Sequence, residues 1–481
     1  MTFTFFNKEI DLPSHHPAFI SNERTIYYDE LDSIISGISS ALLRHGVIES
    51  GKVAILAEPC IDYLLLLMAT WKINAVPIPL NIRLSQNELK TLLKHSGTSH
   101  VLVDEKNDWL IEKNNTVKII NFPFDTMGTE NTNESTLRYD KTALIMYTSG
   151  STGLPKGVLH SFNNFINSAL SSHSAFSFTQ DDKWLLSLPV YHIGGLMILI
   201  RTLLFGSTLI IPSSLKTEDL AHSIKNFRPT LASLVSTSLL RLMETNVKPE
   251  EQLRYTFLGG GPSSKDLIFN ANDAGWKIVK VYGSTETTSM ITAFDTATYP
   301  DKIESSGKAL LGNNIVIVDE QNKILPPGKI GEIAVTGKSI AKGFLYNDEL
   351  SYSSFRDNYF LTGDFGYIDD DGFLFVESRN TDFIISGGEN LNLKEVEKQI
   401  LHHPMINEAC TFGLPDNTWG MILAAAIVLK ENIQLNEKDV TDYLRQHLAS
   451  FKIPKKIIFL KYLPKTELGK IRVDELRNMF H

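Results

Sequence analysis

The sequence predicts a multidomain α/β protein, with a large layered α/β domain followed by a small α+β domain. The chain has 481 residues, more than a single hydrophobic core usually holds. Apolar runs of strand length alternate with segments of helical periodicity, which is typical of layered α/β architecture. After Arg379 the pattern changes to a Gly-rich loop and a compact mixture of helices and strands. We therefore expect an N-terminal domain over residues 1–380 and a C-terminal domain over residues 381–481.

The individual elements follow from periodicity and turn residues. Apolar positions recur at helical spacing from Leu31 to Leu42, and residues 52–56 follow as a buried strand. Residues 61–71 predict a helix and residues 75–79 a short strand, whereas the polar stretch 121–140 predicts a loop. Later segments predict two hairpins, around residues 326–328 and 369–372. They also predict a helix at 393–402, a strand at 424–429 and a second helix at 437–449.

Composition excludes several classes of protein. The balance of 46 basic and 55 acidic residues gives a net charge of −9, which argues against non-specific binding of nucleic acid. The most apolar segments, 63–71 and 196–211, are too short or are interrupted by Arg201 and Gly206, so neither spans a bilayer, which needs roughly 20 apolar residues. The first residues lack the features of a signal peptide. Two distant cysteines, Cys60 and Cys410, suit a reducing compartment. We expect a cytoplasmic protein with no membrane or nucleic-acid partner.

The most informative segment is a loop that follows the apolar run 143–146. It combines hydroxyls, glycines and one lysine, and glycine lets backbone N–H groups approach phosphate oxygens closely. A proline precedes the lysine and the spacing differs from that of a Walker loop, so this is a different kind of phosphate-binding loop. The candidate ATP-binding residues in it are Thr148, Ser149, Gly150, Ser151, Thr152, Gly153 and Lys156.

A second motif follows a predicted strand and contains an aromatic ring, a glycine, hydroxyls and a carboxylate in succession. Tyr282 can stack on adenine, Thr285 can donate to the α-phosphate, and Glu286 can hold Mg²⁺ through its carboxylate oxygens. The aspartate in Thr362-Gly363-Asp364, at the end of another strand, can accept hydrogen bonds from both ribose hydroxyls. The glycines of Leu258–Pro262 indicate a turn or a close backbone approach.

These motifs, in this order, resemble those of the adenylate-forming superfamily, which includes acyl-CoA synthetases, luciferases and nonribosomal adenylation domains. The resemblance rests on Thr148–Gly157, Tyr282–Glu286, Thr362–Asp364 and Pro464–Lys470, spread over most of the chain. It implies the fold of that superfamily, in which a small mobile C-terminal domain follows a large N-terminal one. It also implies two half-reactions: an acid reacts with ATP to form an acyl-adenylate, and the thiol of coenzyme A then displaces AMP.

The resemblance assigns roles to residues and names the ligands. ATP, Mg²⁺ and coenzyme A are the implied cofactors, and a small carboxylic acid is the implied substrate. Asp364 is placed at the ribose, Arg379 beside the ribose or α-phosphate, and Lys470 becomes the catalytic lysine of the closing loop. The candidate catalytic residues are Lys470, Thr285, Glu286 and His192. The remaining candidate nucleotide-binding residues are Gly259, Gly260, Gly261, Gly283 and Ser284.

The expected acyl pocket is built from small and polar residues, namely His192, Gly194, Gly195, Ser233 and Thr288. We expect His192 to line this pocket more than to act as a base, because a carboxylate nucleophile is already ionised. Buried hydroxyls are costly in an apolar fatty-acid tunnel, so this pocket favours a compact aromatic acid with a second carboxylate. Ser233 stands where many members of the superfamily carry proline, and Thr381 falls at the usual hinge position.

A narrower resemblance is to the 2-succinylbenzoate–CoA ligases of menaquinone biosynthesis. It rests on Trp184–Leu196, on Phe257–Pro262 and on the short total length. Two alternatives stay open: a CoA ligase for another aromatic or medium-chain acid, and an adenylation module that charges a carrier protein. A homodimer or a higher homo-oligomer is compatible with the sequence.

Overall fold

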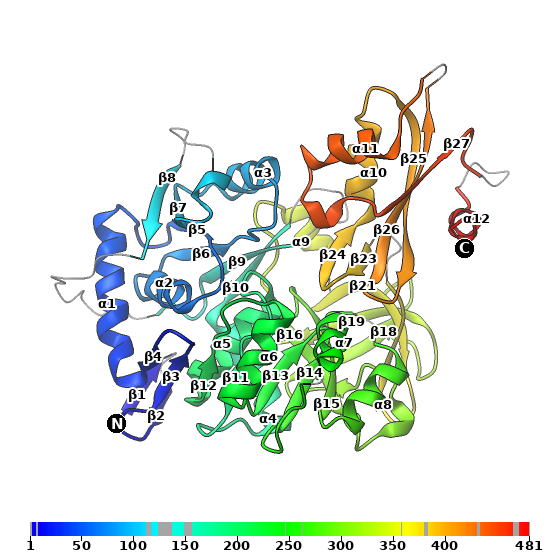
Figure 1. Cartoon of the computed structure of the whole chain (residues 1–481). Coiled ribbons are helices and arrows are strands. Elements are labelled where there is room, and N and C mark those ends of the chain that lie inside the picture. Colours follow the sequence, from blue (N-terminus) through cyan, green and yellow to red (C-terminus); the bar gives the residue numbers. More distant parts are fainter. Residues whose placement is uncertain are drawn as a thin grey trace.

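The computed structural model describes residues 2–5, 8–111, 117–123, 137–148, 156–245, 247–261, 263–356, 358–379, 383–430, 433–464 and 471–480 (Figure 1). Its layers of helix and sheet confirm the α/β class predicted from the sequence. Across these ranges, no helix is both long and apolar enough to cross a membrane.

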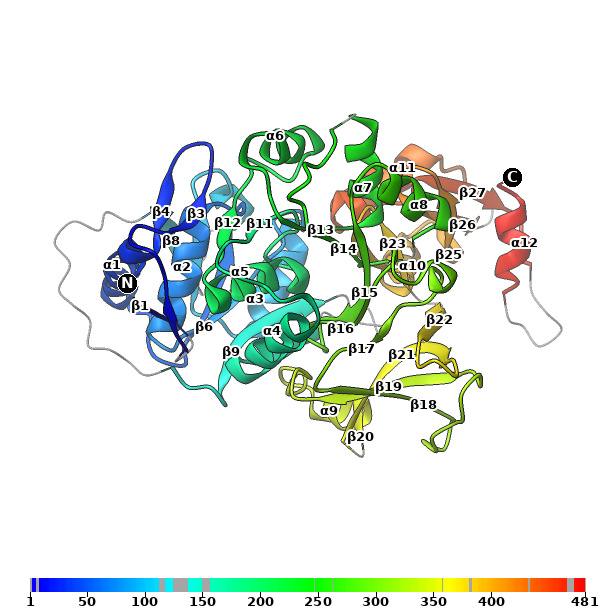
Figure 2. The same cartoon turned by 90° about the horizontal axis from the view of Figure 1, so that it is seen from below.

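The largest sheet has nine strands, of which six consecutive strands run parallel and the strands at the two ends pair antiparallel. Trp184 and Leu185 point to opposite faces, because neighbouring side chains of a strand alternate. Helices α4 (Phe162–Phe176) and α5 (Ile193–Phe205) cover one face, and Figure 2 shows them on the side opposite α6 (Thr217–Phe227). Helices α7 (Ser236–Glu244) and α8 (Lys265–Asp273) share the face of α6. The strands in spatial order are β17 (Lys308–Ala309), β16 (Ser289–Asp295), β15 (Ile278–Ser284), β14 (Tyr255–Leu258), β13 (Leu231–Leu234), β11 (Lys183–Leu185), β12 (Thr208–Ile210), β3 (Pro17–Ile20) and β4 (Thr25–Tyr27).

A second, four-stranded sheet is wholly parallel and is also covered on both faces. Helices α1 (Tyr28–Arg44) and α2 (Ile61–Lys72) pack on one face, and α3 (Gln86–Ser96) packs on the other. The expected elements at 31–42, 52–56, 61–71 and 75–79 are therefore confirmed, with small shifts of their ends. Its strands in spatial order are β6 (Val76–Pro79), β5 (Lys52–Leu56), β7 (His100–Asp104) and β8 (Lys118–Phe122).

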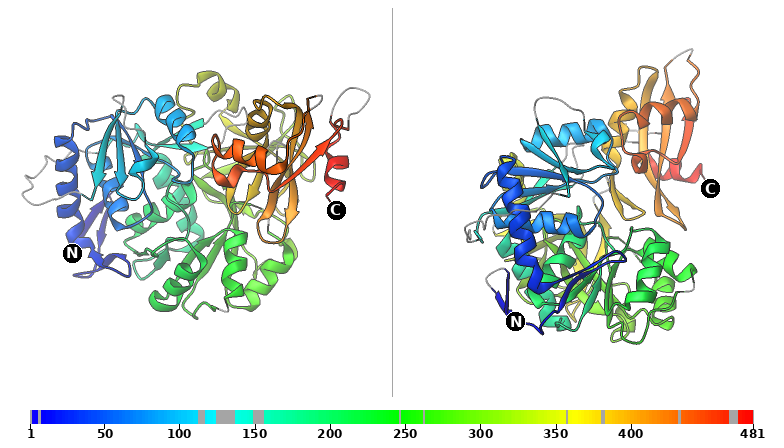
Figure 3. Two further views of the ribbon diagram at one scale, coloured as in Figure 1. Left: turned by 45° about the horizontal axis from the view of Figure 1, so that its top comes forward. Right: turned by 60° about the vertical axis from the view of Figure 1, so that its left-hand side comes forward.

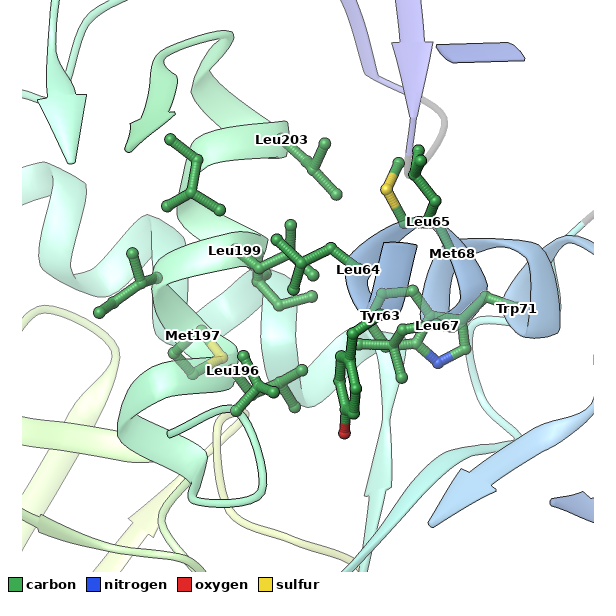
Figure 4. Close-up of a cluster of buried hydrophobic side chains, with 14 of the residues drawn as sticks. Tyr63, Leu64, Leu65, Leu67, Met68, Trp71, Leu196, Met197, Leu199 and Leu203 are labelled. Carbon is green, nitrogen blue, oxygen red and sulfur yellow. The ribbon is translucent and has the colours of Figure 1, made fainter. Parts of the chain in front are cut away.

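Helices α2 and α5 join these two sheets into one core. Both helices are almost entirely buried, and Figure 4 shows the labelled leucines of α2 and α5 lying side by side. Leu64, Leu67, Leu196 and Leu199 have essentially no exposed surface. Full burial of such side chains stabilises a fold by roughly 1.5–3 kcal/mol each. This joint fixes α5, which begins at the predicted acyl pocket.

Three smaller β structures complete the N-terminal part. Strands β1 (Thr2–Phe5) and β2 (Lys8–Asp11) form a hairpin, and β9 (Thr142–Thr148) and β10 (Lys156–Ser161) pair antiparallel on either side of the predicted phosphate loop. A five-stranded antiparallel sheet carries α9 (Asp348–Ser354) and confirms the turn expected at 369–372. The hairpin expected around 326–328 is also confirmed, because residues 326–328 lie in the connection between antiparallel β18 and β19, where the Lys329 N–H donates to the carbonyl oxygen of Pro326 at 3.3 Å. The expected loop at 121–140 begins later than predicted, since Asn121 and Phe122 end β8. The strands of the five-stranded sheet are β18 (Asn313–Val318), β19 (Gly331–Gly337), β20 (Phe355–Arg356), β21 (Tyr359–Ile368) and β22 (Leu374–Arg379).

A separate sheet occupies the C-terminal part, drawn in orange and red at the upper right of Figure 1. Helices α10 (Leu393–Leu401) and α11 (Glu437–Arg445) pack on it, and α12 (Val473–Asn478) follows its last strand. Both views in Figure 3 show this sheet beside the N-terminal layers, not within them. The expected boundary at residues 380 and 381 lies outside the described residues, so it stays a prediction. The strands of this sheet are β23 (Phe383–Ser386), β24 (Glu389–Asn392), β25 (Ile406–Asp416), β26 (Gly420–Leu429) and β27 (Lys456–Leu460).

Candidate active site

A large cavity of about 1150 Å³ lies where the nine-stranded sheet, the five-stranded sheet and the C-terminal sheet meet. Its walls come from the ends of β13, β14 and β15, from the start of α5, and from the loop between β23 and β24. Ligands of open α/β sheets bind outside the carboxyl ends of the strands, so this is the expected place for a site. Most predicted site residues that the structure describes line this one cavity. They are Thr148, Lys156, His192, Gly194, Ser233, Gly259, Gly260, Gly283, Ser284, Thr285, Glu286 and Asp364.

The phosphate end of the cavity is marked by the residues that flank the predicted loop. Thr148 ends β9 and Lys156 begins β10, and both line the cavity. Burial lowers the pKa of Lys156, while the negative charge of Glu286 opposes that shift. Five loop residues lie outside the described residues, so their roles stay predictions: Ser149, Gly150, Ser151, Thr152 and Gly153.

The turn between β15 and β16 presents Thr285 and Glu286 to the cavity. Gly283 is required just before it, because a Cβ at that position would lie 1.9 Å from the carbonyl oxygen of Ser289. The hydroxyl of Thr287 accepts a hydrogen bond from the Ser284 N–H at 2.7 Å, which closes the turn. The two residues at the tip are thus held by their neighbours, leaving a hydroxyl and a carboxylate for a ligand.

Asp364, the residue expected at the ribose, contacts Tyr282, the residue expected to stack on adenine. The Tyr282 hydroxyl donates to Asp364 Oδ2 at 2.7 Å, and Asp364 is buried in the cavity wall. Asp364 also faces Arg379 directly in the register of β21 and β22. A buried carboxylate with further acceptor capacity suits a ligand with hydroxyl donors.

Three predicted site residues lie away from the cavity lining: Thr288 and Gly195 of the expected acyl pocket, and Gly261 of the expected nucleotide site. Thr288 is fully buried away from the cavity, because a left-handed backbone (φ 55°) turns its hydroxyl towards the carbonyl oxygen of Ser339, 2.6 Å away. Gly195 packs inside the first turn of α5, where a Cβ would lie 2.2 Å from the carbonyl oxygen of Pro189. Gly261 faces the C-terminal sheet, since its Cβ would lie 3.2 Å from Ile385. None of the three lines the cavity, whereas Gly194 and Ser233 do.

Arg201 also lines the cavity, although the sequence indicated only that it interrupts an apolar segment. It lies two turns into α5, its side chain is 1% exposed, and it lines the same cavity as Ser187 and Ser233. Its Nε donates to Ser172 Oγ at 3.0 Å, and its guanidinium carbon lies 5.7 Å from the centre of the Trp184 ring. Nη2 is buried with no hydrogen-bond partner in the described part of the chain, where no carboxylate pairs with Arg201.

Burial lowers the pKa of Arg201 to about 9, so its guanidinium is still a cation at neutral pH. A buried cation without a counter-ion is costly. The cost falls when an anion enters the cavity and supplies the missing acceptor. Beside it, Ser233 Oγ accepts a hydrogen bond from Trp184 Nε1 at 3.3 Å, which adds a polar group to an otherwise apolar wall. This end of the cavity is therefore suited to an anionic group next to an aromatic one.

The C-terminal sheet closes the cavity from the other side. The turn residues Gly387 and Gly388 line it, as does Glu389 at the start of β24, and Glu389 is buried between two N-terminal residues. Its carboxylate lies 2.9 Å from Arg83 Nη1 and 3.3 Å from His192 Nε2. Burial acts to raise the pKa of Glu389, but His192 and Arg83 outweigh it and hold that pKa below its usual value.

A second contact between the two parts lies further from the cavity. Lys452 Nζ lies 2.7 Å from Glu88 of α3 and 2.7 Å from Glu395 of α10. Only 9% of its side chain is exposed. Lys470, Thr381 and the side chain of Arg379 lie outside the described residues, so their roles stay predictions.

Comparison with known proteins identifies relatives of the whole chain. Residues 6–345 match the family model described as AMP-binding enzyme, and residues 395–470 match that described as AMP-binding enzyme C-terminal domain. The 2-succinylbenzoate–CoA ligase of Bacillus subtilis (strain 168) is 33% identical over 466 residues, which are 96% of this chain and 94% of that protein.

Solved structures of the Bacillus subtilis o-succinylbenzoate CoA synthetase are similar in fold. A double mutant of that synthetase, bound with its product analogue OSB-NCoA, gives a TM-score of 0.90 at 32% identity, covering 96% of each chain. The same synthetase in complex with ATP and magnesium ion gives a TM-score of 0.71 at 32% identity, covering 97% of each chain.

Proposed function

The chain belongs to the AMP-binding enzyme family, and on that basis we propose that it is an ATP-dependent acid–CoA ligase acting on 2-succinylbenzoate. The proposed reaction forms an acyl-adenylate with release of pyrophosphate, and then a CoA thioester with release of AMP. The observation that carries the choice of acid is Arg201, a buried cation at the acyl end of the cavity.

The first half-reaction brings a carboxylate to the α-phosphate of ATP, so catalysis depends on positioning and on neutralising charge. Lys156 and Thr285 line the cavity where the phosphates are expected, and Asp364 would hold the ribose. The Glu286 carboxylate is a hard oxygen ligand in the same wall, so it fits Mg²⁺. When bound there, Mg²⁺ would offset the charge of the phosphates. Lys470 is proposed to bridge the acid and the α-phosphate.

The acid follows from the charge of the pocket. A fatty acid would bring an apolar chain against Arg201 and leave its cation without a counter-ion. Benzoate has a single carboxylate, which must reach the α-phosphate and so is not available to Arg201. An aromatic acid with a second carboxylate can do both, because one group reacts while the other accepts from the guanidinium. 2-Succinylbenzoate meets this requirement, and the relative from Bacillus subtilis is a ligase for that acid.

The arrangement of the two parts supports a CoA-dependent second step. At equal sequence identity, the TM-score is higher for the synthetase structure with a CoA-type product analogue than for that with ATP and magnesium. The chain therefore resembles more closely the arrangement found with the product analogue. Glu389, at the start of β24, lines the cavity in this arrangement and lies beside His192. A cytoplasmic location and a homo-oligomeric state are further proposals, as expected from the sequence.

An acid panel tests the proposal. Pyrophosphate release and then CoA thioester formation are measured with 2-succinylbenzoate, benzoate, 4-coumarate and octanoate. We expect kcat/KM for 2-succinylbenzoate to exceed the others at least tenfold, which corresponds to about 1.4 kcal/mol. Turnover of octanoate with none of 2-succinylbenzoate would overturn the choice of acid. Pyrophosphate release without thioester formation, rescued by a pantetheinylated carrier protein, would favour the carrier-charging alternative.

A further inference from the structure

Strand β10 contacts the end of the turn that carries Thr285 and Glu286. Lys156 begins this strand and lines the same cavity as Thr285 and Glu286. His160 lies four residues later, and residues two or four apart in a strand point to the same face. His160 Nδ1 lies 3.1 Å from Thr288 Oγ1, two residues beyond Glu286. Strand β10 therefore contacts the turn at Thr288, through the side chain of His160.

Thr288 is fully buried and is held by several hydrogen bonds. Its hydroxyl donates to the carbonyl oxygen of Ser339 at 2.6 Å, and its own carbonyl oxygen accepts from Ser168 Oγ at 2.6 Å. Its backbone has φ 55°, which a β-branched residue adopts only under constraint. Because the single hydroxyl proton goes to Ser339, His160 must supply the proton of its contact with Thr288.

His160 is suited to donate a fixed hydrogen bond, and it is not suited to transfer a proton. It has no exposed surface, and burial lowers its pKa to about 3, so its ring is neutral under ordinary conditions. Its ring stacks on Phe165 with the centroids 5.6 Å apart, which fixes the ring plane. The neutral ring with its proton on Nδ1 is a rigid donor, and it holds Thr288 at a fixed distance from β10.

We propose that His160 and Thr288 are positioning residues that fix Glu286 for Mg²⁺ and ATP. Both side chains are buried and neither lines the cavity. They hold the turn at Thr288, two residues after Glu286. The backbone of Glu286 is held as well, because the Ala341 N–H donates to its carbonyl oxygen at 2.8 Å. This inference rests on the proposed function only in assigning Glu286 to Mg²⁺.

The test measures nucleotide binding by calorimetry, with and without Mg²⁺, using a non-hydrolysable ATP analogue. Wild-type protein should bind more tightly with Mg²⁺. Thr288→Val keeps the shape but removes the hydroxyl, and it should lose about tenfold of that Mg²⁺-dependent gain. Thr288→Ser keeps the hydroxyl and should stay within twofold of wild type. His160→Leu should behave like Thr288→Val, whereas His160→Asn keeps a donor near Nδ1 and should recover part of the gain.

The decisive comparison is with Glu286→Gln, which removes the carboxylate itself. If Thr288 acts through Glu286, adding Thr288→Val to Glu286→Gln should cause less than a twofold further loss. Two results would overturn the inference: equal losses from Thr288→Val in the wild-type and Glu286→Gln proteins, or a Thr288→Val variant whose Mg²⁺-dependent gain in binding equals that of wild type. If Thr288→Val fails to fold, the pair His160→Leu and His160→Asn makes the same comparison. Binding is measured without the acid, so failure of the acid panel is separate from failure here.

Discussion

Glu389 and His192 meet across the two parts of the chain, with Oε2 and Nε2 3.3 Å apart. Glu389 is the first residue of β24 in the C-terminal sheet, and His192 lies just before α5 in the cavity wall. A single carboxylate thus connects the position of the C-terminal part to the acyl end of the site. The contact with Arg83 at 2.9 Å strengthens this connection.

Glu389→Gln should therefore impair the second half-reaction more than the first. The amide keeps the size of the side chain but loses its charge, so the contacts with Arg83 and His192 weaken. We expect thioester formation from preformed acyl-adenylate to slow at least tenfold, about 1.4 kcal/mol, in line with a lost charge-assisted contact. Pyrophosphate release from ATP and acid should change less than threefold. Single-turnover assays of the two steps measure this, and equal losses in both would contradict it.

The same contact predicts how the arrangement depends on pH. The pKa of Glu389 is held below 4.5, so its carboxylate stabilises the contact above that value. That stabilisation is lost as the pH falls through the lowered pKa. Fluorescent labels on the two parts should report a difference between wild type and Glu389→Gln at pH 7 that disappears as the pH falls through the lowered pKa. A difference that grew on acidification would contradict the assignment.

Lys452 should hold the same arrangement from further away. Burial acts to lower its pKa, but Glu395 and Glu88 outweigh burial and raise it, so the lysine stays charged at neutral pH. Lys452→Met removes the counter-ion of two carboxylates whose side chains are 12% and 18% exposed, and breaking a buried ion pair costs roughly 3–5 kcal/mol. The labelled protein should shift away from the described arrangement. Lys394→Met is the matched control, because Lys394 pairs with Glu397 while 54% exposed, and such pairs contribute roughly 0–1 kcal/mol.

Much of the candidate nucleotide site was predictable because its residues are adjacent in sequence. Tyr282 lies in β15, and Thr285 and Glu286 directly follow that strand, so their order alone brings them near one another. Thr288 was misplaced because a left-handed backbone reverses the direction of its side chain, and no sequence pattern signalled that conformation. Gly195 was misplaced because a glycine pair can serve a ligand or close packing, and only the distance to Pro189 distinguishes these.

Contacts between distant segments were beyond the sequence argument. Glu389 lies 306 residues from Arg83, and nothing local to either residue indicates the pairing. Arg201 did carry a signal: one cation among the apolar residues of α5, in a helix buried on nearly every side. Arginine is almost never fully buried unless paired, so an arginine in such a helix indicates a ligand or a partner. The cavity and the unpaired Nη2 then indicate which.

The most direct test of the central claim is the discrimination between acids by wild type and by Arg201→Met. 2-Succinylbenzoate is compared with two analogues that each lack one carboxylate, and the analogue that keeps the reactive carboxylate is the informative one. Wild type should prefer 2-succinylbenzoate over it by at least about a hundredfold in kcat/KM, because the analogue leaves a buried cation unpaired. Arg201→Met should lose most of that preference and Arg201→Lys less, with melting temperatures no lower than wild type, since an unpaired buried charge is removed. An Arg201→Met variant that keeps the full preference would contradict the account.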